Sequence, residues 1–310
     1  MSLFQRSPKA RHLLNHYALM PADVVSFQCV RARAHAFCQE REWQNFHTPV
    51  NLALALSGEC GEISEIFQWK GPLDKGTDYF TAKEKEHIGE EIADVLIYST
   101  RLCDVCGIDL AYSVRHCASV TSSLRYSKIE SNIMFENTCS STGINSCDMS
   151  DKWDKLNFAE LESLMPEGLQ SPVSPRALAL SIQSRCGQAC ELFLNKSESH
   201  STIGLPDWPR SDVAELALLI GSICLLLSRL AKFSNKSLSK CVTDKFLKNE
   251  AKYPAEMVKG SSAKYTAYAD SIKSKIEKNV DRRSIFFSAA ATAAVALIGY
   301  FVGVRRASLL

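Results

Sequence analysis

Two stretches of this sequence repeat the same order of residue types 126 positions apart. The stretch "VNLALALSGECGEISEIFQWK" at 50–70 is matched by "RALALSIQSRCGQACELFLNK" at 176–196. Apolar residues recur at helical intervals in both, so each predicts one helix of a duplicated helical unit. A chain of 310 residues is long enough for two such units. Equivalent residues include Leu52 and Leu178, Cys60 and Cys186, Gly61 and Gly187, Glu65 and Glu191, and Phe67 and Phe193.

The rest of the first half also has a helical pattern. No segment alternates apolar and polar residues for long enough to indicate a sheet. The sequence therefore predicts an all-α fold, an antiparallel bundle with short connections. Helices are expected over residues 24–46, about 50–69, 82–106 and 109–128.

The composition changes to Ser, Asn, Thr, Cys and Asp over residues 131–153, which is typical of a linker. The helical pattern resumes after it. The expected organisation is an N-terminal tail over 1–23, a first helical unit over 24–130, the linker over 131–153, a second unit over 154–275 and a membrane helix over 284–304.

The membrane helix is predicted from "SIFFSAAATAAVALIGYFVGV", which has 21 residues and no charge. Arginine pairs flank it on both sides, and its length matches the ~30 Å hydrocarbon core of a bilayer. The alternative is a buried C-terminal helix. Because only six residues follow, we expect a tail anchor with the catalytic part facing the cytosol. The mitochondrial outer membrane or the endoplasmic reticulum is the expected location, with the peroxisome as a further alternative.

The overall composition argues against some classes of function. Lys and Arg number 36 against 34 Asp and Glu, and no basic stretch is interleaved with aromatics, so nucleic-acid binding is not expected. Twelve cysteines are scattered through apolar segments without a signal peptide before them, which favours a reducing compartment. Cys103 and Cys106 form a CxxC, which we interpret as two small buried side chains rather than a zinc or redox site.

Two carboxylate pairs occur on successive predicted helices. Glu59 and Glu62 are three residues apart, as are Glu91 and Asp94, so each pair lies on one helix face. A solvated helix face would explain one such pair, but here the acids stand among apolar residues. Four negative charges in one pocket are costly unless cations fill it. Oxygen ligands without His or Cys favour Mg²⁺, with Mn²⁺ as an alternative.

The run "EREWQNFHTPVNLALALSGECGEISEIFQWKG", followed by "EEIADVLIY", resembles the MazG-type all-α nucleoside triphosphate pyrophosphohydrolases, and most of all those that hydrolyse dCTP. The resemblance covers roughly residues 25–110. It implies that Glu59, Glu62, Glu91 and Asp94 bind Mg²⁺ and that Trp43, His47, Asn51, Trp69 and Tyr98 recognise the base.

The second half departs from this pattern where the first acid pair belongs, because Arg185 and Gln188 stand there. Its end, "DKFLKNEAKYPAEMVKGSSAKY", nevertheless resembles the closing motif of the family, which the first half lacks. The second half lacks the first acid pair and the first half lacks the closing motif. These complementary losses predict that the two units form a pseudo-twofold pair with one composite site. The alternative is a second half that only stabilises the first. The closing-motif residues, expected to bind substrate, are Lys245, Asn249, Lys252 and Tyr253.

The resemblance implies Mg²⁺-dependent hydrolysis of dCTP, or of modified dCTP, to dCMP and pyrophosphate. Glu62 or Glu65 would orient or deprotonate the attacking water, and the sequence leaves the choice open. dUTP or another non-standard nucleotide is the alternative substrate. A nucleotide-binding membrane scaffold without turnover is the alternative of a different class, and the four acids of the first half argue against it. The intrachain pair is expected to suffice for the site, with a further homodimer left open.

Overall fold

The helices begin at the polar residues that the sequence places before each apolar run. Thr48 caps α3 (Pro49–Phe67), and its hydroxyl accepts the backbone N–H of Asn51 at 3.3 Å. Thr81 and Glu84 form a capping box at the start of α4 (Ala82–Cys106). That helix ends at Gly107, whose φ of 73° is in the left-handed region that glycine adopts without strain.

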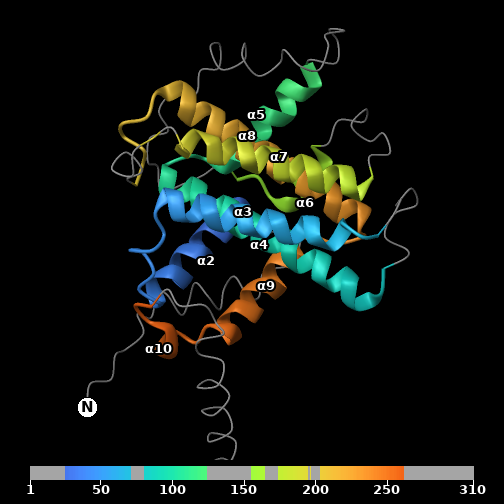
Figure 1. The fold of residues 1–310 in the computed structure, drawn as a ribbon, viewed down its shortest axis with the longest axis horizontal. Helices are drawn as coiled ribbons and strands as arrows, with labels where there is room; N and C mark the ends of the chain where they lie inside the picture. The colour runs from blue at the N-terminus through green and yellow to red at the C-terminus, as the bar shows by residue number, and fades with distance from the viewer. Residues whose placement is uncertain are drawn as a thin grey trace, which may run out of the picture. The chain divides into compact units, whose positions relative to one another are not determined.

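The computed structural model describes residues 25–70, 80–123, 155–164, 174–194, 196 and 203–261. These residues contain no strand, and one isolated backbone bridge joins Ser26 to Asn157, so the all-α prediction is confirmed for them (Figure 1). The other helices are α2 (Phe27–Glu40), α5 (Leu110–Ser123), α6 (Phe158–Ser163), α7 (Pro175–Leu194), α8 (Arg210–Phe233), α9 (Leu238–Lys252) and α10 (Ala255–Val258).

The first helix is shorter than the sequence predicts, because it ends at Glu40 rather than near residue 46. The backbone N–H groups of Arg41 and Trp43 both donate to the carbonyl of Cys38, and Glu42 takes a φ of 55°. This hydrogen-bonded turn satisfies carbonyls at the helix end and reverses the chain. It brings Trp43 back beside Phe37, with ring centroids 5.8 Å apart.

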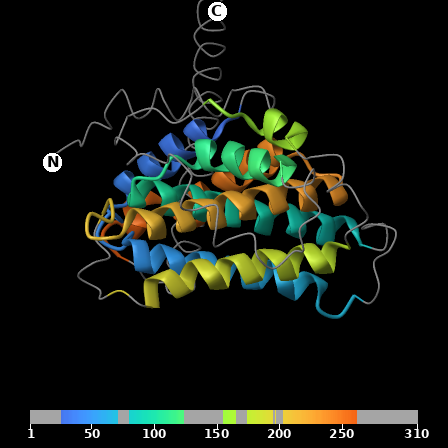
Figure 2. The same cartoon turned by 90° about the horizontal axis from the view of Figure 1, so that it is seen from above.

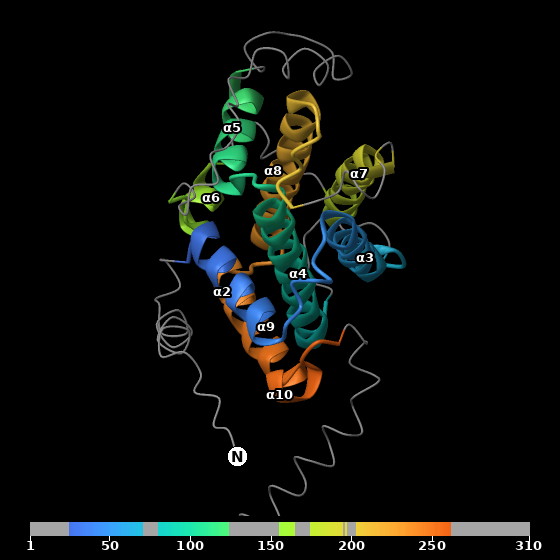
Figure 3. The ribbon, with the colours of Figure 1, turned by 90° about the vertical axis from the view of Figure 1, so that its left-hand side faces the viewer.

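Helices from the two halves of the sequence alternate in three layers (Figures 2 and 3). One outer layer pairs α3 with α7, and the middle layer pairs α4 with α8. The other outer layer holds α2 beside α4 and α5 with α6 beside α8. In the first half, α3, α4 and α5 therefore each pack against a helix of the second half. Helix α2 packs against α4.

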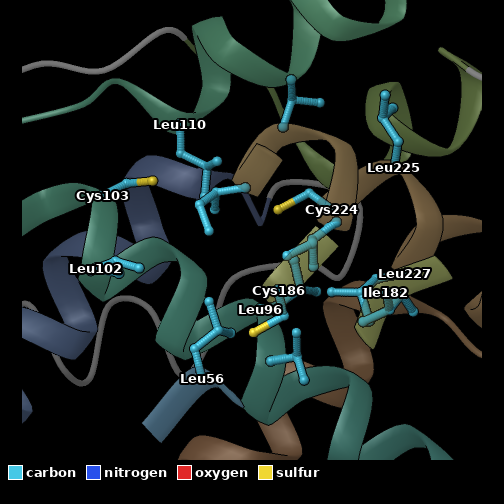
Figure 4. Close-up of a cluster of buried hydrophobic side chains, with 14 of the residues drawn as sticks. Leu56, Leu96, Leu102, Cys103, Leu110, Ile182, Cys186, Cys224, Leu225 and Leu227 are labelled. Atoms are coloured by element: carbon cyan, nitrogen blue, oxygen red, sulfur yellow. The ribbon is translucent and has the colours of Figure 1, made fainter. Parts of the chain in front are cut away.

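One continuous hydrophobic core lies between these layers. Leu56 from α3 and Leu96 from α4 face Ile182 from α7 and Leu227 from α8 (Figure 4). The described helices up to Ala251 form one compact unit, and the residues from Lys252, with α10, form a separate one. The predicted tail at 1–23, the linker at 131–153 and the membrane helix at 284–304 lie outside the described residues.

The described cysteines, ten in number, carry no disulfide, and most are buried. Cys103 and Cys106 lie inside α4, and burial raises the pKa of both thiols well above the ordinary value. This agrees with the interpretation of the CxxC as small buried side chains.

Within the described residues, α8 is the one helix long and apolar enough to cross a membrane. Most of its apolar residues are buried between α4, α5 and α7. We interpret α8 as the central core helix of the bundle.

Gly221 of α8 lies against the backbone of α5. A Cβ at Gly221 would lie 3.0 Å from the backbone carbonyl of Ser113 and 3.2 Å from the sulfur of Cys117. Gly221→Ala should lower the free energy of unfolding by about 1–3 kcal/mol, because the backbone cannot move aside easily. Urea denaturation measures this change.

Gly187 on α7 provides the matched control, because nothing lies within 4 Å of a Cβ added there. Gly187→Ala should stabilise the protein by up to about 1 kcal/mol through helix propensity. Equal effects of the two substitutions would contradict the proposed close approach of α5 and α8.

Candidate functional site

Helices α3 and α4 run antiparallel and bring the two predicted carboxylate pairs together. One carboxylate oxygen from each of Glu59, Glu62 and Glu91 lies within 4.8 Å of the other two. Glu62 is exposed and Glu59 half-buried, whereas Glu91 is 4% exposed and Asp94 is 8% exposed. We call Glu59, Glu62, Glu91 and Asp94 the acid cluster. Its base is buried in the bundle, and its mouth opens to solvent.

Glu91 is the electrostatic centre of the acid cluster. Burial, followed by the negative charges of Asp94, Glu62 and Glu59, raises the pKa of Glu91 to about 8. Its Oε1 lies 3.1 Å from His87 Nδ1, while its Oε2 is buried and has no hydrogen-bond partner among the described residues. A buried carboxylate oxygen without a donor, next to two further carboxylates, fits a hard divalent cation such as Mg²⁺ or Mn²⁺.

The raised pKa of Glu91 makes the metal-free protein sensitive to pH. The unfolded chain loses this proton near pH 4.5, whereas the folded chain keeps it up to about pH 8. The free energy of unfolding should therefore fall as pH rises between these values. Urea denaturation at pH 5 and pH 8.5 in EDTA measures this slope, and Glu91→Gln should flatten it. Identical slopes in the two proteins would contradict the assignment.

Lys245 of α9 brings the second half of the chain to the acid cluster. Its ammonium forms an ion pair with Asp94, and both side chains are nearly buried. Burial lowers the pKa of Lys245, but Asp94, Glu91 and Glu90 outweigh it, so the net pKa is raised. Lys245 therefore remains protonated and places a positive charge beside the acids.

The other residues of the closing motif continue along α9. Asn249 follows Lys245 by four residues, one turn further on the same helix face, and its side chain has no partner among the described residues. Lys248 forms ion pairs with Glu86 at 2.6 Å and Glu90 at 2.5 Å. Lys252 Nζ lies 5.4 Å from the ring centroid of Tyr253, and both belong to the separate unit, so they are not placed against the cluster.

An aromatic and imidazole pair lies at one end of the α3 and α4 pair. The ring centroids of Trp43 and His47 are 6.3 Å apart, and Arg101 Nε donates to His47 Nδ1 at 3.2 Å. Burial, followed by the charge of Arg101, lowers the pKa of His47 to about 4, so this imidazole is neutral at pH 7.

The spacing on α4 connects this pair to the acids. Asp94, Tyr98 and Arg101 follow one another at intervals of four and three residues, so they lie along one face of α4. Seven residues separate Asp94 from Arg101, which is about 10 Å along the helix axis. Tyr98 is half-buried between them and packs against the core. The acid cluster and the aromatic pair thus share one face of α4.

Two other predicted residues are less closely grouped. Asn51, in the first turn of α3, donates from its side chain to the carbonyl of Phe46 at 2.9 Å. Trp69 follows the other end of α3 and is 88% exposed. Eighteen residues of helical rise separate Asn51 from Trp69, about 27 Å, so the chain does not bring Trp69 to Trp43 and His47.

Glu65 lies on α3 but away from the acid cluster. It lines a cavity of about 440 Å³ between α3 and α7, together with Arg176 and Leu180 of α7. Of the two acids considered for orienting water, only Glu62 stands with Glu59 and Glu91.

The equivalent positions of the second half form no acid cluster. Arg185 Nη1 donates to Gln188 Oε1 at 3.1 Å, and these residues stand where Glu59 and Glu62 stand in the first half. Asp212, the equivalent of Glu91, pairs with Lys196 at 2.7 Å. Arg185 thus bonds an uncharged amide, and Asp212 is neutralised by Lys196, as expected from the substitutions.

Sequence reasoning missed Arg101, which contacts the predicted base-recognition residue His47 directly. It also missed His87, the partner of Glu91. A signal for Arg101 existed, because "VLIYSTRLCDVC" at 95–106 is an otherwise apolar run containing one basic residue and one acid. A buried charge of this kind is rare unless it is paired.

Comparison with known proteins supports a relationship over part of the chain. The chain is 47% identical over 83 residues to dCTP pyrophosphatase 1 of Mus musculus, covering 26% of this chain and 49% of that protein. It is 46% identical over 83 residues to the Homo sapiens protein of the same name, with the same coverage. The Bos taurus protein is 43% identical over 95 residues, covering 30% of this chain and 56% of the relative.

The matched region spans about half the length of these curated relatives. No protein-family model and no solved structure matches the chain. The acid cluster, as a candidate metal site, and the partial identity both point to a nucleotide pyrophosphohydrolase. Over roughly a quarter of its length, this chain is similar to dCTP pyrophosphatase 1.

Proposed function

We propose that this protein is a Mg²⁺-dependent nucleoside triphosphate pyrophosphohydrolase that converts dCTP, or a modified dCTP, to dCMP and pyrophosphate. The acid cluster carries the proposal, since Glu59, Glu62 and Glu91 converge and one buried oxygen of Glu91 has no donor in the described part of the chain. The partial identity to dCTP pyrophosphatase 1 supports the choice of substrate. Removal of surplus or modified deoxycytidine nucleotides would be the biological role.

In this proposal the acid cluster holds the cation, with Mn²⁺ as an alternative to Mg²⁺. The bound ion would neutralise the triphosphate and lower the pKa of a water molecule. Glu62 is the acid placed to orient or deprotonate that water, since it is exposed at the mouth of the cluster. Lys245 would leave Asp94 for a phosphate oxygen and act there as a point charge. Asn249 would add a hydrogen bond from the next turn.

The base would lie at the other end of the same face. Trp43 offers an aromatic surface for stacking, and the neutral His47 offers a hydrogen bond to the base edge. Tyr98 stands between the acids and His47, where the sugar would pass. Trp69 lies too far along α3 to join this slot in the same chain, so its role at the base would require a second copy of the chain. A homodimer would supply it.

We also infer that the two halves form a pseudo-twofold pair with one working site. Cys60 and Cys186 are equivalent residues on α3 and α7, which pack against each other, and Cys60 is among the groups that raise the pKa of the Cys186 thiol. Helix α5 of the first half covers α8 of the second, and α9 of the second half reaches α4 of the first through Lys245. These contacts between the halves support a composite site, in which the first half provides the acids and the second half provides Lys245 and Asn249.

Pyrophosphate release from each deoxynucleoside triphosphate, with Mg²⁺ and with EDTA, tests the function. We expect Mg²⁺-dependent release that is fastest with dCTP or 5-methyl-dCTP. A preference for dUTP would show that the proposed substrate is wrong but that the proposed reaction is right. Nucleotide binding without pyrophosphate release from any nucleotide would refute the proposed enzymatic activity. It would favour the alternative of a nucleotide-binding scaffold without turnover.

The membrane anchor stays a proposal based on the charge-free run at 284–304. A protein that ends at residue 275 should be active and leave the membrane fraction. The full-length protein should resist extraction by alkaline carbonate, and its release by carbonate would refute the span. Fluorescent fusions would distinguish the mitochondrial outer membrane from the endoplasmic reticulum.

A further inference from the structure

A buried charge network stands behind His47. Arg101, 7% exposed, donates from Nε to His47 Nδ1 at 3.2 Å and from Nη1 to Asp104. Asp104 also accepts from Arg31 Nε of α2 at 2.6 Å. The remaining polar neighbours from α2 are His35, whose Nδ1 is 3.5 Å from Arg101 Nη1, and the Cys38 sulfur, 3.8 Å from Arg101 Nη2. The donors of Arg101 thus point in three fixed directions.

The contact from Arg101 determines which nitrogen of His47 carries hydrogen. An arginine side chain is always a donor, so the Nδ1 that faces its Nε must be the acceptor. The neutral imidazole then carries its hydrogen on Nε2. No partner for Nε2 is found among the described residues, and Nε2 is not sealed from solvent. The free face of His47 is therefore a hydrogen-bond donor.

We propose that Arg101 is a positioning residue that holds His47 as the Nε2–H tautomer and thereby makes the base slot select a pyrimidine with an unprotonated N3. This inference rests on the proposed function. Asp104 and Arg31 hold the guanidinium in place, since Asp104 bridges the two arginines. His47 touches the base, and Arg101 acts through it.

The chemistry of the two pyrimidines explains the selection. Cytosine and 5-methylcytosine present an acceptor at N3, which a fixed N–H can satisfy. Uracil and thymine carry a hydrogen at N3, so two donors would face each other and both would lose their water partners. A site built around one fixed hydrogen-bonding group rejects a mismatched ligand far more strongly than an apolar pocket does.

Nitrogen chemical shifts of His47 and the ratio of kcat/KM for dCTP over dUTP test the proposal together. The folded wild type should show a single tautomer with hydrogen on Nε2, assigned by the signals that His47→Gln removes. Arg101→Met should give a mixture of tautomers and lower the dCTP preference by about tenfold at pH 8, where a released imidazole is neutral. A structural role alone would change neither the tautomer nor the substrate ratio.

Two further variants keep the test decisive. If the single variant folds poorly, Arg101→Met with Asp104→Asn also removes the buried carboxylate that would keep Arg31 as its partner but lose Arg101, and it should show the same two changes. Arg33→Met removes another buried arginine, which pairs with Glu250 at 3.1 Å and lies over Phe246, and it should change neither readout.

Hydrogen on Nδ1 in the wild type would overturn the proposal, and so would an unchanged substrate ratio in a folded Arg101 variant. If the wild type releases no pyrophosphate from any nucleotide, the proposed function fails and the role at the base fails with it. The nitrogen shifts still decide in that case whether Arg101 sets the tautomer of His47.

Discussion

Glu91→Gln should abolish Mg²⁺-dependent pyrophosphate release while the protein keeps its fold. The substitution removes the buried carboxylate at the centre of the acid cluster and leaves an amide of the same shape. We expect kcat to fall by at least about 100-fold, because preorganised charge at the reacting phosphates is lost. The metal-free variant should be at least as stable as the wild type at pH 8, because a costly buried charge is gone.

Glu86→Gln provides the matched control on the same helix. Glu86 is exposed and pairs with Lys248, which keeps Glu90 as a second partner. This variant should retain wild-type kcat and the same increase in melting temperature with Mg²⁺. If Glu91→Gln is folded and turns over dCTP at the wild-type rate, the metal assignment is wrong.

Lys245→Ala should lower kcat/KM for dCTP by roughly 30-fold or more, because it removes a nearly buried charge that pairs with Asp94 and that we propose binds the triphosphate. The metal-free variant should also unfold more easily, since the nearly buried Asp94 carboxylate loses the ammonium group of Lys245. Added Mg²⁺ should restore much of that stability without restoring activity. Steady-state kinetics and thermal unfolding with and without Mg²⁺ separate the two effects.

Asn249→Ala and Lys240→Ala complete this test on α9. Asn249 has no partner within the described structure, so its removal should lower kcat/KM with little change in stability. Lys240 pairs with Asp244 on the exposed face of α9, and its removal should change neither. Full activity in both Lys245→Ala and Asn249→Ala would refute the composite site and leave the second half as a stabilising partner.

Local sequence signals determined much of this fold. The Thr48–Pro49 pair and the Thr81 and Glu84 box place the starts of α3 and α4, because a cap satisfies backbone groups within one turn. The three-residue spacing of Glu59 and Glu62, repeated by Glu91 and Asp94, was enough to predict the acid cluster. Helix geometry fixes which side chains share a face, and an antiparallel connection brings neighbouring faces together.

Other features depended on contacts between residues far apart in the chain. The sequence predicted that α2 ends near residue 46, but it ends at Glu40. The helical spacing of apolar residues continues past Glu40, whereas the backbone forms a hydrogen-bonded turn at Glu42. Glu65 has the same spacing from Glu62 as Glu62 has from Glu59, yet it faces the cavity beside α7. Two steps of three residues drift by about a third of a turn around a helix of 3.6 residues per turn, so the third acid leaves the shared face.

The sequence by itself determined the all-α class, the helix starts and the spacing of the acids, because these follow from interactions within a few residues. Only the tertiary structure decided that α9 places Lys245 against Asp94 and that Arg101 contacts His47. Those pairs are 151 and 54 residues apart, and no local rule relates their positions. Which helix covers a given face is decided by how the whole core packs, since many neighbours can bury the same apolar stripe.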